Sequence, residues 1–144
     1  MSTTVGDFLL VRAGQLRLGF PLDEVVEVSA LGAVHPVPSV APALRGVTLA
    51  RGRLVPLLHL GALLASIPCP EERCGTGILA ALGGHPVCLE VDEADVLTRE
   101  IMLPVPPEKP IPWALAVVRL EDGMIPILNL DALAERLTNS EIRP

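Results

Sequence analysis

Short aliphatic runs separated by glycine and proline recur along the chain, and this pattern is typical of β-strands. Two pairs of runs flank glycine turns and predict hairpins: 8–11 with 15–20, and 78–81 with 86–91. Two more strands, Leu54–Leu58 and Met124–Leu128, contain Pro56 and Pro126. Because proline donates no hydrogen bond, we expect these strands at a sheet edge or with a bulge. Asp131 is expected to cap a short helix beginning at Ala132 and ending at Leu137.

The same pattern occurs twice in the chain, as an internal repeat. Shifting the sequence by 70 residues aligns 8–64 with 78–134 without a gap, and eleven of the 57 positions are identical, against roughly five expected by chance. The segment Ser66–Gly77 links the two copies. We therefore predict an all-β protein of two similar barrels, each of about five strands, docked together with short helices at their ends.

Composition and charge exclude some functions. The chain has 144 residues, enough for one domain or two very small ones, and half of them are hydrophobic. The net charge of −6 and the 2% aromatic content argue against nucleic-acid binding, which needs clustered cations and, for single strands, stacking rings. The core must be built mainly from Leu, Val, Ile and Ala.

The sequence predicts a cytoplasmic protein without direct membrane insertion. No basic residue precedes the first apolar run, as a signal peptide would require. The longest apolar run, Val55–Ile67, has 13 residues and is too short to span a bilayer. Three cysteines leave one unpaired, the usual pattern of a reduced cytosolic protein.

No cluster predicts catalysis, a metal or a cofactor. The pair Cys69-x4-Cys74 has only Cys88 and His85 as further candidate zinc ligands, with the wrong spacing. None of the three histidines pairs locally with Ser, Cys or Asp as a nucleophile would require. The acidic run 90–95 lacks the ligand spacing and the glycine of a calcium loop. We therefore expect a protein that is not an enzyme.

The segment Gly46–Leu60 resembles the signature block of the CheW-like family. That block typically has a Gly-Val pair, an Asn-Leu-Arg-Gly turn and an aliphatic-Pro-aliphatic strand ending in Asp-Leu. Phe20–Val28 resembles the family's V-x-E-V segment, and Leu89–Asp92 its V-V-D-x-V strand. The resemblance runs from Phe8 to about Leu137. It implies one CheW-like domain over 1–144, with SH3-like five-stranded barrels as subdomains over 8–64 and 78–134.

The resemblance implies a non-enzymatic scaffold of chemotaxis-type signal transduction. Such an adaptor couples the cytoplasmic tip of a chemoreceptor, a methyl-accepting protein, to the regulatory domain of a CheA-like histidine kinase. Barrel-to-barrel docking is the implied kinase contact. Two alternatives stay open: a divergent adaptor that retains one of the two partners, and a small-ligand sensor that uses the cleft between the barrels.

The resemblance also implies the partner-binding residues. Arg51 and Gly52 form an exposed turn that contacts the receptor tip, where the alternative is a solvated turn arginine. The groove between the barrels would be lined by Leu22, Val25, Glu27, Val28 and Val91. The alternative for these aliphatic residues is ordinary core.

Three residues depart from the family pattern. Leu49 stands where Asn is usual, His59 where Asp is usual, and Ala94 where a larger aliphatic residue is usual. Leu49 must be buried in the barrel or offered to a partner, and His59 removes a fixed negative charge. We therefore expect one interface, with receptor or kinase, to be weaker than in an ordinary member.

Overall fold

A computed structural model describes residues 4–38, 41–121 and 123–142. The first half holds β1 (Thr4–Ala13), β2 (Leu16–Pro21), the 3₁₀ helix η1 (Leu22–Glu24), β3 (Glu27–Ala30), β4 (Val34–His35), β5 (Leu44–Ala50), β6 (Arg53–His59) and α1 (Leu60–Ala65). The second half holds β7 (Thr76–Leu82), β8 (His85–Val91), β9 (Glu93–Met102), β10 (Ala114–Leu120), β11 (Gly123–Leu128) and α2 (Leu130–Ile142). Both predicted hairpins and both proline-containing strands are confirmed.

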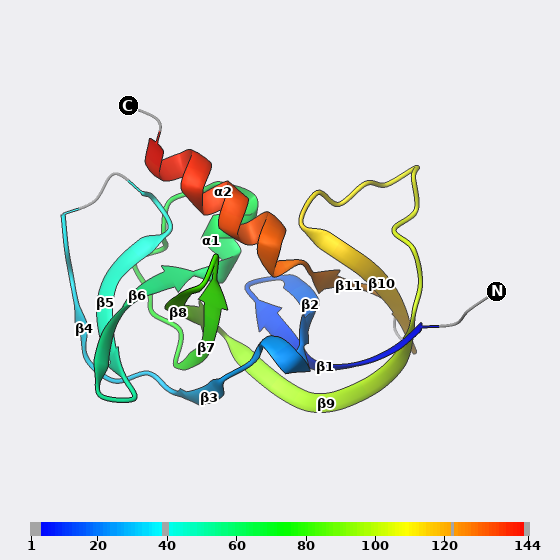
Figure 1. Cartoon of the computed structure of the whole chain (residues 1–144), viewed down its shortest axis with the longest axis horizontal. Helices are drawn as coiled ribbons and strands as arrows, with labels where there is room; N and C mark the ends of the chain where they lie inside the picture. The colour runs from blue at the N-terminus through cyan, green and yellow to red at the C-terminus, as the bar shows by residue number, and fades with distance from the viewer. Residues whose placement is uncertain (1–3, 39–40, 122, 143–144) are drawn as a thin grey trace.

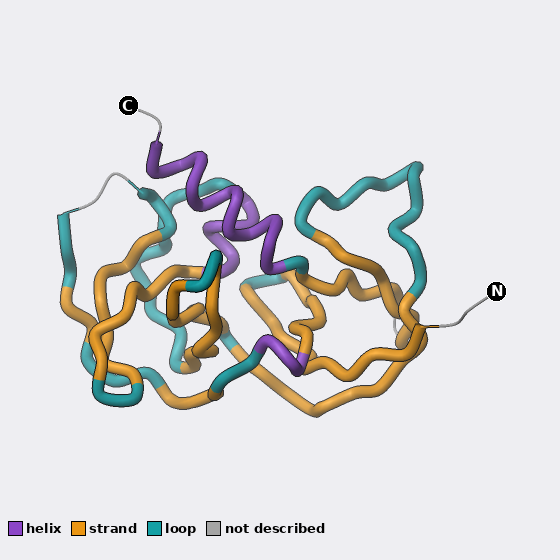
Figure 2. The backbone as a smooth tube through the Cα atoms, in the orientation of Figure 1, coloured by secondary structure: helices purple, strands orange, loops and turns teal. Residues whose placement is uncertain are grey.

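The strands form two sheets that lie side by side (Figure 1). One has five strands in the order β10-β11-β2-β1-β9, and the other has six in the order β3-β7-β8-β6-β5-β4. Here the five-stranded sheet is called barrel A and the six-stranded sheet barrel B. The chain crosses from barrel A to barrel B through η1 and returns through Asp92, between β8 and β9. The two α-helices lie together on one side of the sheets (Figure 2).

The two barrels do not follow the boundaries of the two repeats. With the 70-residue offset, β7-β8 corresponds to β1-β2, yet β1-β2 pairs with strands of the second copy and β7-β8 with strands of the first. The prediction that 8–64 and 78–134 each form one barrel is therefore wrong. The hairpins of the two copies are similar aliphatic sequences, so nothing local decides which barrel each one joins. The barrel that each hairpin joins is decided by its pairing with strands that are distant in the sequence.

The repeat itself is visible in the backbone hydrogen bonds. The His59 N–H donates to the Ala43 carbonyl oxygen at 2.8 Å, and the Asn129 N–H donates to the Trp113 carbonyl oxygen, also at 2.8 Å. The β5–β6 and β10–β11 ladders shift register at matched places, between 44 and 46 and between 114 and 116. The two copies therefore build the same local structure, even though their hairpins are exchanged.

The proline-containing strands are interior strands, not edge strands. β6 lies between β5 and β8, and β11 lies between β10 and β2. The parallel pairing of each begins one residue after its proline, at Leu57 opposite Cys88 and at Ile127 opposite Gly19. Pro56 and Pro126 therefore lie where the strand has a neighbour on one side, and their missing N–H groups interrupt no parallel ladder.

The N-caps of the two α-helices occupy equivalent positions. His59 Nδ1 accepts a hydrogen bond from the Ala62 N–H at 2.9 Å at the start of α1. Asn129 Oδ1 accepts from the Asp131 N–H at 3.0 Å at the start of α2. The predicted cap, Asp131, is wrong: it lies in the first turn of a helix of 13 residues. Asn is as good a cap as Asp, and its side chain follows β11 directly.

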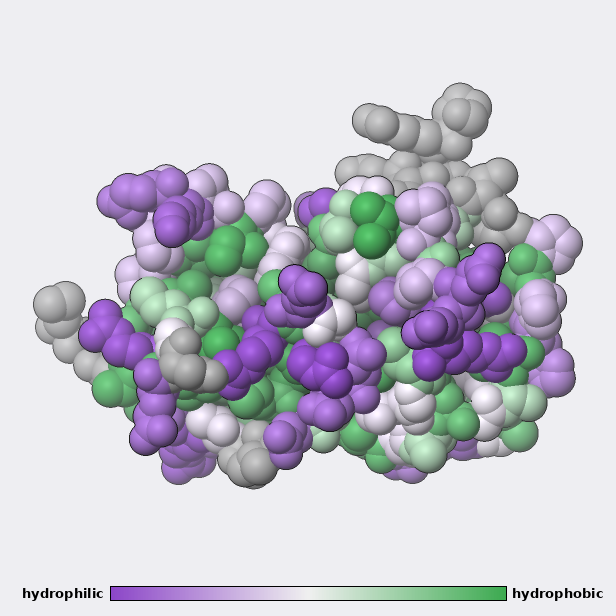
Figure 3. Space-filling view, turned by 180° about the vertical axis from the view of Figure 1, so that it is seen from behind, coloured by the Kyte–Doolittle hydropathy of each residue, from purple (hydrophilic) through white to green (hydrophobic). Residues whose placement is uncertain are grey.

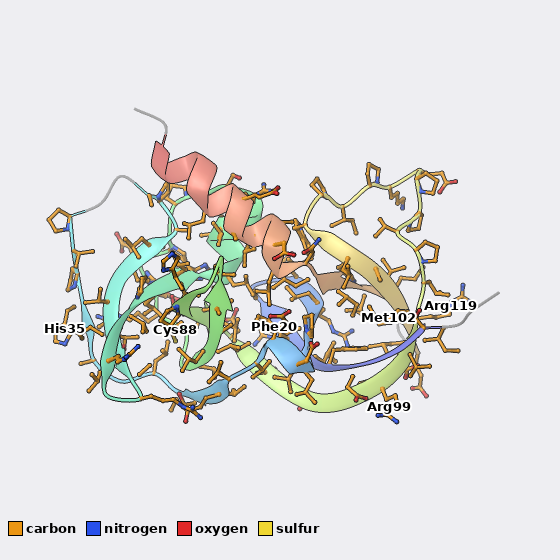
Figure 4. The ribbon with its side chains drawn as sticks, in the orientation of Figure 1. Phe20, His35, Cys88, Arg99, Met102 and Arg119 are labelled. Atoms are coloured by element: carbon orange, nitrogen blue, oxygen red, sulfur yellow. The ribbon has the colours of Figure 1, made fainter. Side chains whose placement is uncertain are left out.

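The largest hydrophobic cluster lies between the barrels. It joins residues of both exchanged hairpins with residues of both helices, including Leu18, Phe20, Ile78, Leu89 and Leu133. Phe20 is seen in the middle of the molecule in Figure 4. Smaller clusters fill barrel A around Phe8 and barrel B around Leu57. β2 and β8 are therefore buried on both faces over 18–20 and 87–91.

Gly19 shows how tightly the exchanged hairpin packs. A Cβ atom there would lie 2.3 Å from Ile127 Cδ1 and 2.8 Å from the Phe8 ring. Both neighbours belong to the buried cluster inside barrel A.

We predict that Gly19→Ala lowers the free energy of unfolding by about 2 kcal/mol, because overpacking a filled core costs about 1–3 kcal/mol. Urea denaturation measures this value. Gly32→Ala is the matched control, since a Cβ atom at Gly32 meets nothing within 4 Å. Equal stability of the two variants would contradict tight packing at β2.

Candidate functional site

The β5–β6 turn has a strained arginine at its tip. Arg51 and Gly52 both have positive φ, 51° and 76°, as the central residues of a type I′ hairpin turn require. Asn, Asp and Gly are the residues preferred there, and a residue with a longer side chain costs about 1 kcal/mol in this conformation. Arg51 is therefore not the residue that the turn itself favours.

The structure brings Arg51 and Glu27 together from separate elements. Arg51 Nε lies 3.9 Å from Glu27 Oε2 at the start of β3, and the two side chains are 59% and 41% exposed. Val28 follows Glu27 on β3 and is also exposed. Such an exposed, long ion pair contributes little stability, so both groups can be offered to a partner. The turn and β3 together form the candidate interface.

The other predicted groove residues do not belong to this surface. Val91 is fully buried in the central cluster, so its prediction as a groove residue is wrong. It lies in β8, whose two faces are both covered. Val25 is half-buried and packs against the same cluster. Leu22 lines a separate groove of about 460 Å³ on barrel A, next to Phe8 and Met102.

A buried polar cluster was missed by the sequence analysis. Arg45 Nε donates to Glu90 Oε1 at 2.8 Å, and Glu90 has no exposed side-chain surface. The Cys74 N–H donates to Glu90 Oε2 at 2.9 Å, and Arg45 also donates to the carbonyl oxygens of Pro70 and Glu72. This ion pair therefore ties the link between the repeats to β5 and β8. Its residues are far apart in the chain, and no local pattern predicts their contact.

The same cluster places a thiol beside an imidazole. Cys74 Sγ lies 3.9 Å from His59 Nε2 and 3.5 Å from Asp92 Oδ1. His59 Nδ1 accepts the helix-capping hydrogen bond, so the neutral ring carries its proton on Nε2. That nitrogen can donate to the sulfur but cannot take a proton from it. This contact joins residues 15 positions apart, so the absence of a local His–Cys pair in the sequence did not indicate it.

This thiol is not arranged as a nucleophile. Burial, followed by the nearby Asp92 and Glu90 carboxylates, raises the pKa of Cys74 to about 11. A catalytic cysteine needs the opposite shift, which produces the thiolate at neutral pH. Within the described ranges no three His, Cys, Asp or Glu residues are grouped to hold a metal ion. The thiol of Cys74 therefore stays protonated at neutral pH.

Asp92 holds the chain where it returns to barrel A. Its N–H donates to the Arg12 carbonyl oxygen at 2.9 Å, and its carboxylate accepts from the Gly14 N–H. The hydrogen bond from Gly14 lowers the pKa of Asp92. Asp92 is the aspartate of the segment that resembles V-V-D-x-V. It joins the connection between β8 and β9 to the β1–β2 turn.

The comparisons with known proteins agree with the fold. The model of the CheW-like domain matches residues 7–138. The chain belongs to the CheW-like domain family. Its fold is similar to that of the scaffolding protein TtCheW from Thermoanaerobacter tengcongensis, with a TM-score of 0.77 at 18% identity over 90% of this chain and 92% of that one. The predicted fold class, with two SH3-like barrels, is confirmed by this likeness.

One curated relative is similar in part. A stretch of 69 residues, 48% of this chain, is 41% identical to Protein FrzA of Myxococcus xanthus and covers 41% of that protein. The chain thus spans less than half of the length of this relative. The CheW-like domain is a scaffold and adaptor domain of chemotaxis-type signalling. No helix within the described part of the chain is long and apolar enough to cross a membrane.

The cap at His59 predicts a dependence of stability on pH. Burial lowers the pKa of His59, the neighbouring Glu90 opposes this shift, and Arg45 adds to it. The folded chain thus binds this proton less readily than the unfolded chain. His59 therefore contributes stability that is complete above about pH 6.5 and is lost as the pH falls below that value.

His59→Asn tests this, because Asn is an uncharged cap and occupies the equivalent position 129. We expect the wild-type protein to lose about 1 kcal/mol more than the variant between pH 7 and pH 5, the ordinary worth of an N-cap. Urea denaturation at both pH values measures the difference. Parallel losses in the two proteins would show that protonation of His59 does not break the cap.

Proposed function

We propose that this chain is a non-enzymatic cytoplasmic adaptor that couples the cytoplasmic tip of a chemoreceptor to the regulatory domain of a CheA-like histidine kinase. The observation that carries the proposal is the arginine at the tip of the β5–β6 turn. Arg51 lies in a conformation that favours Asn or Gly, and it is exposed beside Glu27. An exposed arginine in a conformation that lowers stability indicates that its side chain contacts a partner protein.

The chemistry of this surface suits a receptor tip made of a helical hairpin. A guanidinium makes forked hydrogen bonds to carboxylates or to free carbonyl oxygens at a helical turn. The ion pair with Glu27 is long and solvated, so Arg51 can exchange this partner for a receptor group at little cost. Receptor state would be transmitted by differential contact with this surface.

The kinase contact is proposed for the other barrel surfaces. The regulatory domain of a CheA-like kinase is expected to share this fold, so a barrel of this chain would dock on a similar barrel of the kinase. Leu49 and His59 are the two departures that were expected to weaken an interface, and of these only Leu49 is well exposed. His59 is buried as a helix cap, with 8% of its surface exposed.

Arg51→Glu is expected to weaken binding of a chemoreceptor tip fragment at least tenfold, about 1.4 kcal/mol, and to leave kinase binding unchanged. Arg51→Asn should also weaken receptor binding, yet it should raise the free energy of unfolding by up to about 1 kcal/mol, because Asn-Gly is the favoured type I′ sequence. Calorimetric titration and urea denaturation measure these quantities.

Arg119→Asn is the matched control, because Arg119 is exposed on β10 at the far end of barrel A (Figure 4). It should change the affinity for the receptor tip less than twofold. Unchanged receptor affinity in Arg51→Glu would make Arg51 a solvated turn residue. A wild-type chain that binds neither the receptor tip nor the kinase domain would overturn the adaptor function.

A further inference from the structure

Barrel B is made of two halves that meet at a short seam. The strand order β3-β7-β8-β6-β5-β4 places β8 beside β6, and these two strands are joined by three parallel residue pairs. By comparison, seven pairs join β7 to β8 and six join β5 to β6. Here β3, β7 and β8 are called the β3 half, and β4, β5 and β6 the β5 half. Few backbone hydrogen bonds therefore fix the two halves relative to each other.

The candidate interface has one part on each half of barrel B. Arg51 lies at the β5–β6 turn of the β5 half, and Glu27 lies on β3, the edge strand of the other half. The turn lies beside β3 in Figure 1, although β7 and β8 come between β3 and β6 in the order of the sheet. The sheet must therefore curl in one particular way to bring these two side chains together.

A buried ion pair bridges the seam between the halves. Arg45 on β5 donates to Glu90 on β8 at 2.8 Å, and the two side chains are 10% and 0% exposed. Glu90 is the one acidic residue that is buried in the described part of the chain, whereas hydrophilic residues lie on the surface of both lobes in Figure 3. The pair is therefore a direct side-chain link from one half to the other.

The same pair fixes the segment that leads into the β3 half. Arg45 donates to the carbonyl oxygens of Pro70 and Glu72, and Glu90 accepts from the Cys74 N–H at 2.9 Å. A guanidinium has several donors in one rigid plane, so a single arginine can hold the carboxylate and both carbonyl groups at once. The start of β7 is thereby anchored to β5.

This anchored segment in turn holds β3. The carbonyl oxygen of Gly75, the residue after Cys74, accepts a hydrogen bond at 2.9 Å from the N–H of Leu31, the residue after β3. β3 also pairs with β7 from Glu27 to Ala30. A continuous series of contacts therefore runs from β5, through the ion pair and the link between the repeats, to the strand that carries Glu27.

Barrel A shows that such a barrel does not need this ion pair. By the 70-residue offset, Arg45 corresponds to Leu115 and Glu90 to Phe20, and neither of these is charged. Barrel A nevertheless joins β11 to β2 in the same parallel arrangement. An apolar pair is often at least as stable as a buried ion pair, because both charges must lose their water on burial. The ion pair of barrel B therefore indicates a role in geometry rather than in stability.

We propose that Arg45 and Glu90 are positioning residues of the candidate interface, which hold β3 and the β5–β6 turn at the spacing that lets Arg51 and Glu27 meet the receptor tip together. This inference rests on the proposed function and adds the internal contact that sets the geometry of its binding surface. Arg45 and Glu90 act from inside barrel B and present almost no surface to a partner.

The test uses the full chain with Arg45→Met and Glu90→Leu combined, because an apolar pair removes the bridge without leaving a buried unpaired charge. We expect the affinity for the receptor tip fragment, measured by calorimetry, to fall about fivefold or more, with a urea midpoint close to that of wild type. The amide hydrogen of Leu31 should exchange roughly tenfold faster, because the segment that holds its acceptor is no longer anchored.

A thermodynamic cycle separates positioning from a general loss of stability. Arg51→Glu should weaken receptor binding at least about tenfold in the wild-type background but less than about threefold in the double variant, where Arg51 is no longer held in place. Thr48→Val is the matched control, because it removes a buried hydrogen bond of 2.9 Å from β5 to the Ala33 carbonyl oxygen, and this bond does not reach β8. It should change receptor affinity less than about twofold.

The remaining outcomes decide against the proposal in different ways. Unchanged receptor affinity in the double variant overturns it, and so do additive effects of the double variant and Arg51→Glu. If the double variant does not fold, Arg45→Lys replaces it, because lysine keeps the charge beside Glu90 but lacks the planar fork that reaches the two carbonyl oxygens. Unchanged receptor affinity in Arg45→Lys would then overturn the proposal. If wild type does not bind the receptor tip, the proposed function fails, and this inference fails with it.

Discussion

The hydrophobic cluster between the barrels is the contact on which the rest of the structure depends. Both exchanged hairpins and both helices meet there, and β2 and β8 bury their second faces against it. A strand with one covered face alternates buried and exposed residues, whereas 18–20 of β2 and 87–91 of β8 are buried without a break. Neither barrel can therefore be separated without exposing one face of its own hairpin. This shared core holds the two barrels in one fixed relation.

Polar contacts secure the places where the chain passes around this core. Asp92 joins the crossing between β8 and β9 to the β1–β2 turn, and the Arg45–Glu90 pair ties down the link between the repeats. A buried ion pair adds little net stability compared with apolar packing, but it penalises every arrangement that separates its charges. We interpret these groups as selecting one path of the chain among several that would bury the same aliphatic residues.

A rigid body of this kind suits a protein whose proposed work is to hold two partners. The candidate receptor surface lies on one hairpin of barrel B, where residues contribute little to the core. Leu49 can therefore differ from the usual family pattern without disturbing the fold. The equivalent hairpin of barrel A has Arg119 and Met124 at the matched positions, so the two copies share a backbone and differ in the surface they present.

The sequence alone determined the β class, the hairpins, the repeat and the Arg51-Gly52 turn, because each depends on residues close together in the chain. Periodicity and turn chemistry act over a few residues, and the repeat is a comparison of the chain with itself. Tertiary structure alone decided that the hairpins are exchanged, that Val91 is buried, and that His59 caps a helix beside Cys74. These outcomes depend on which distant segments pack together, and similar aliphatic strands leave that choice to the contacts of the whole core.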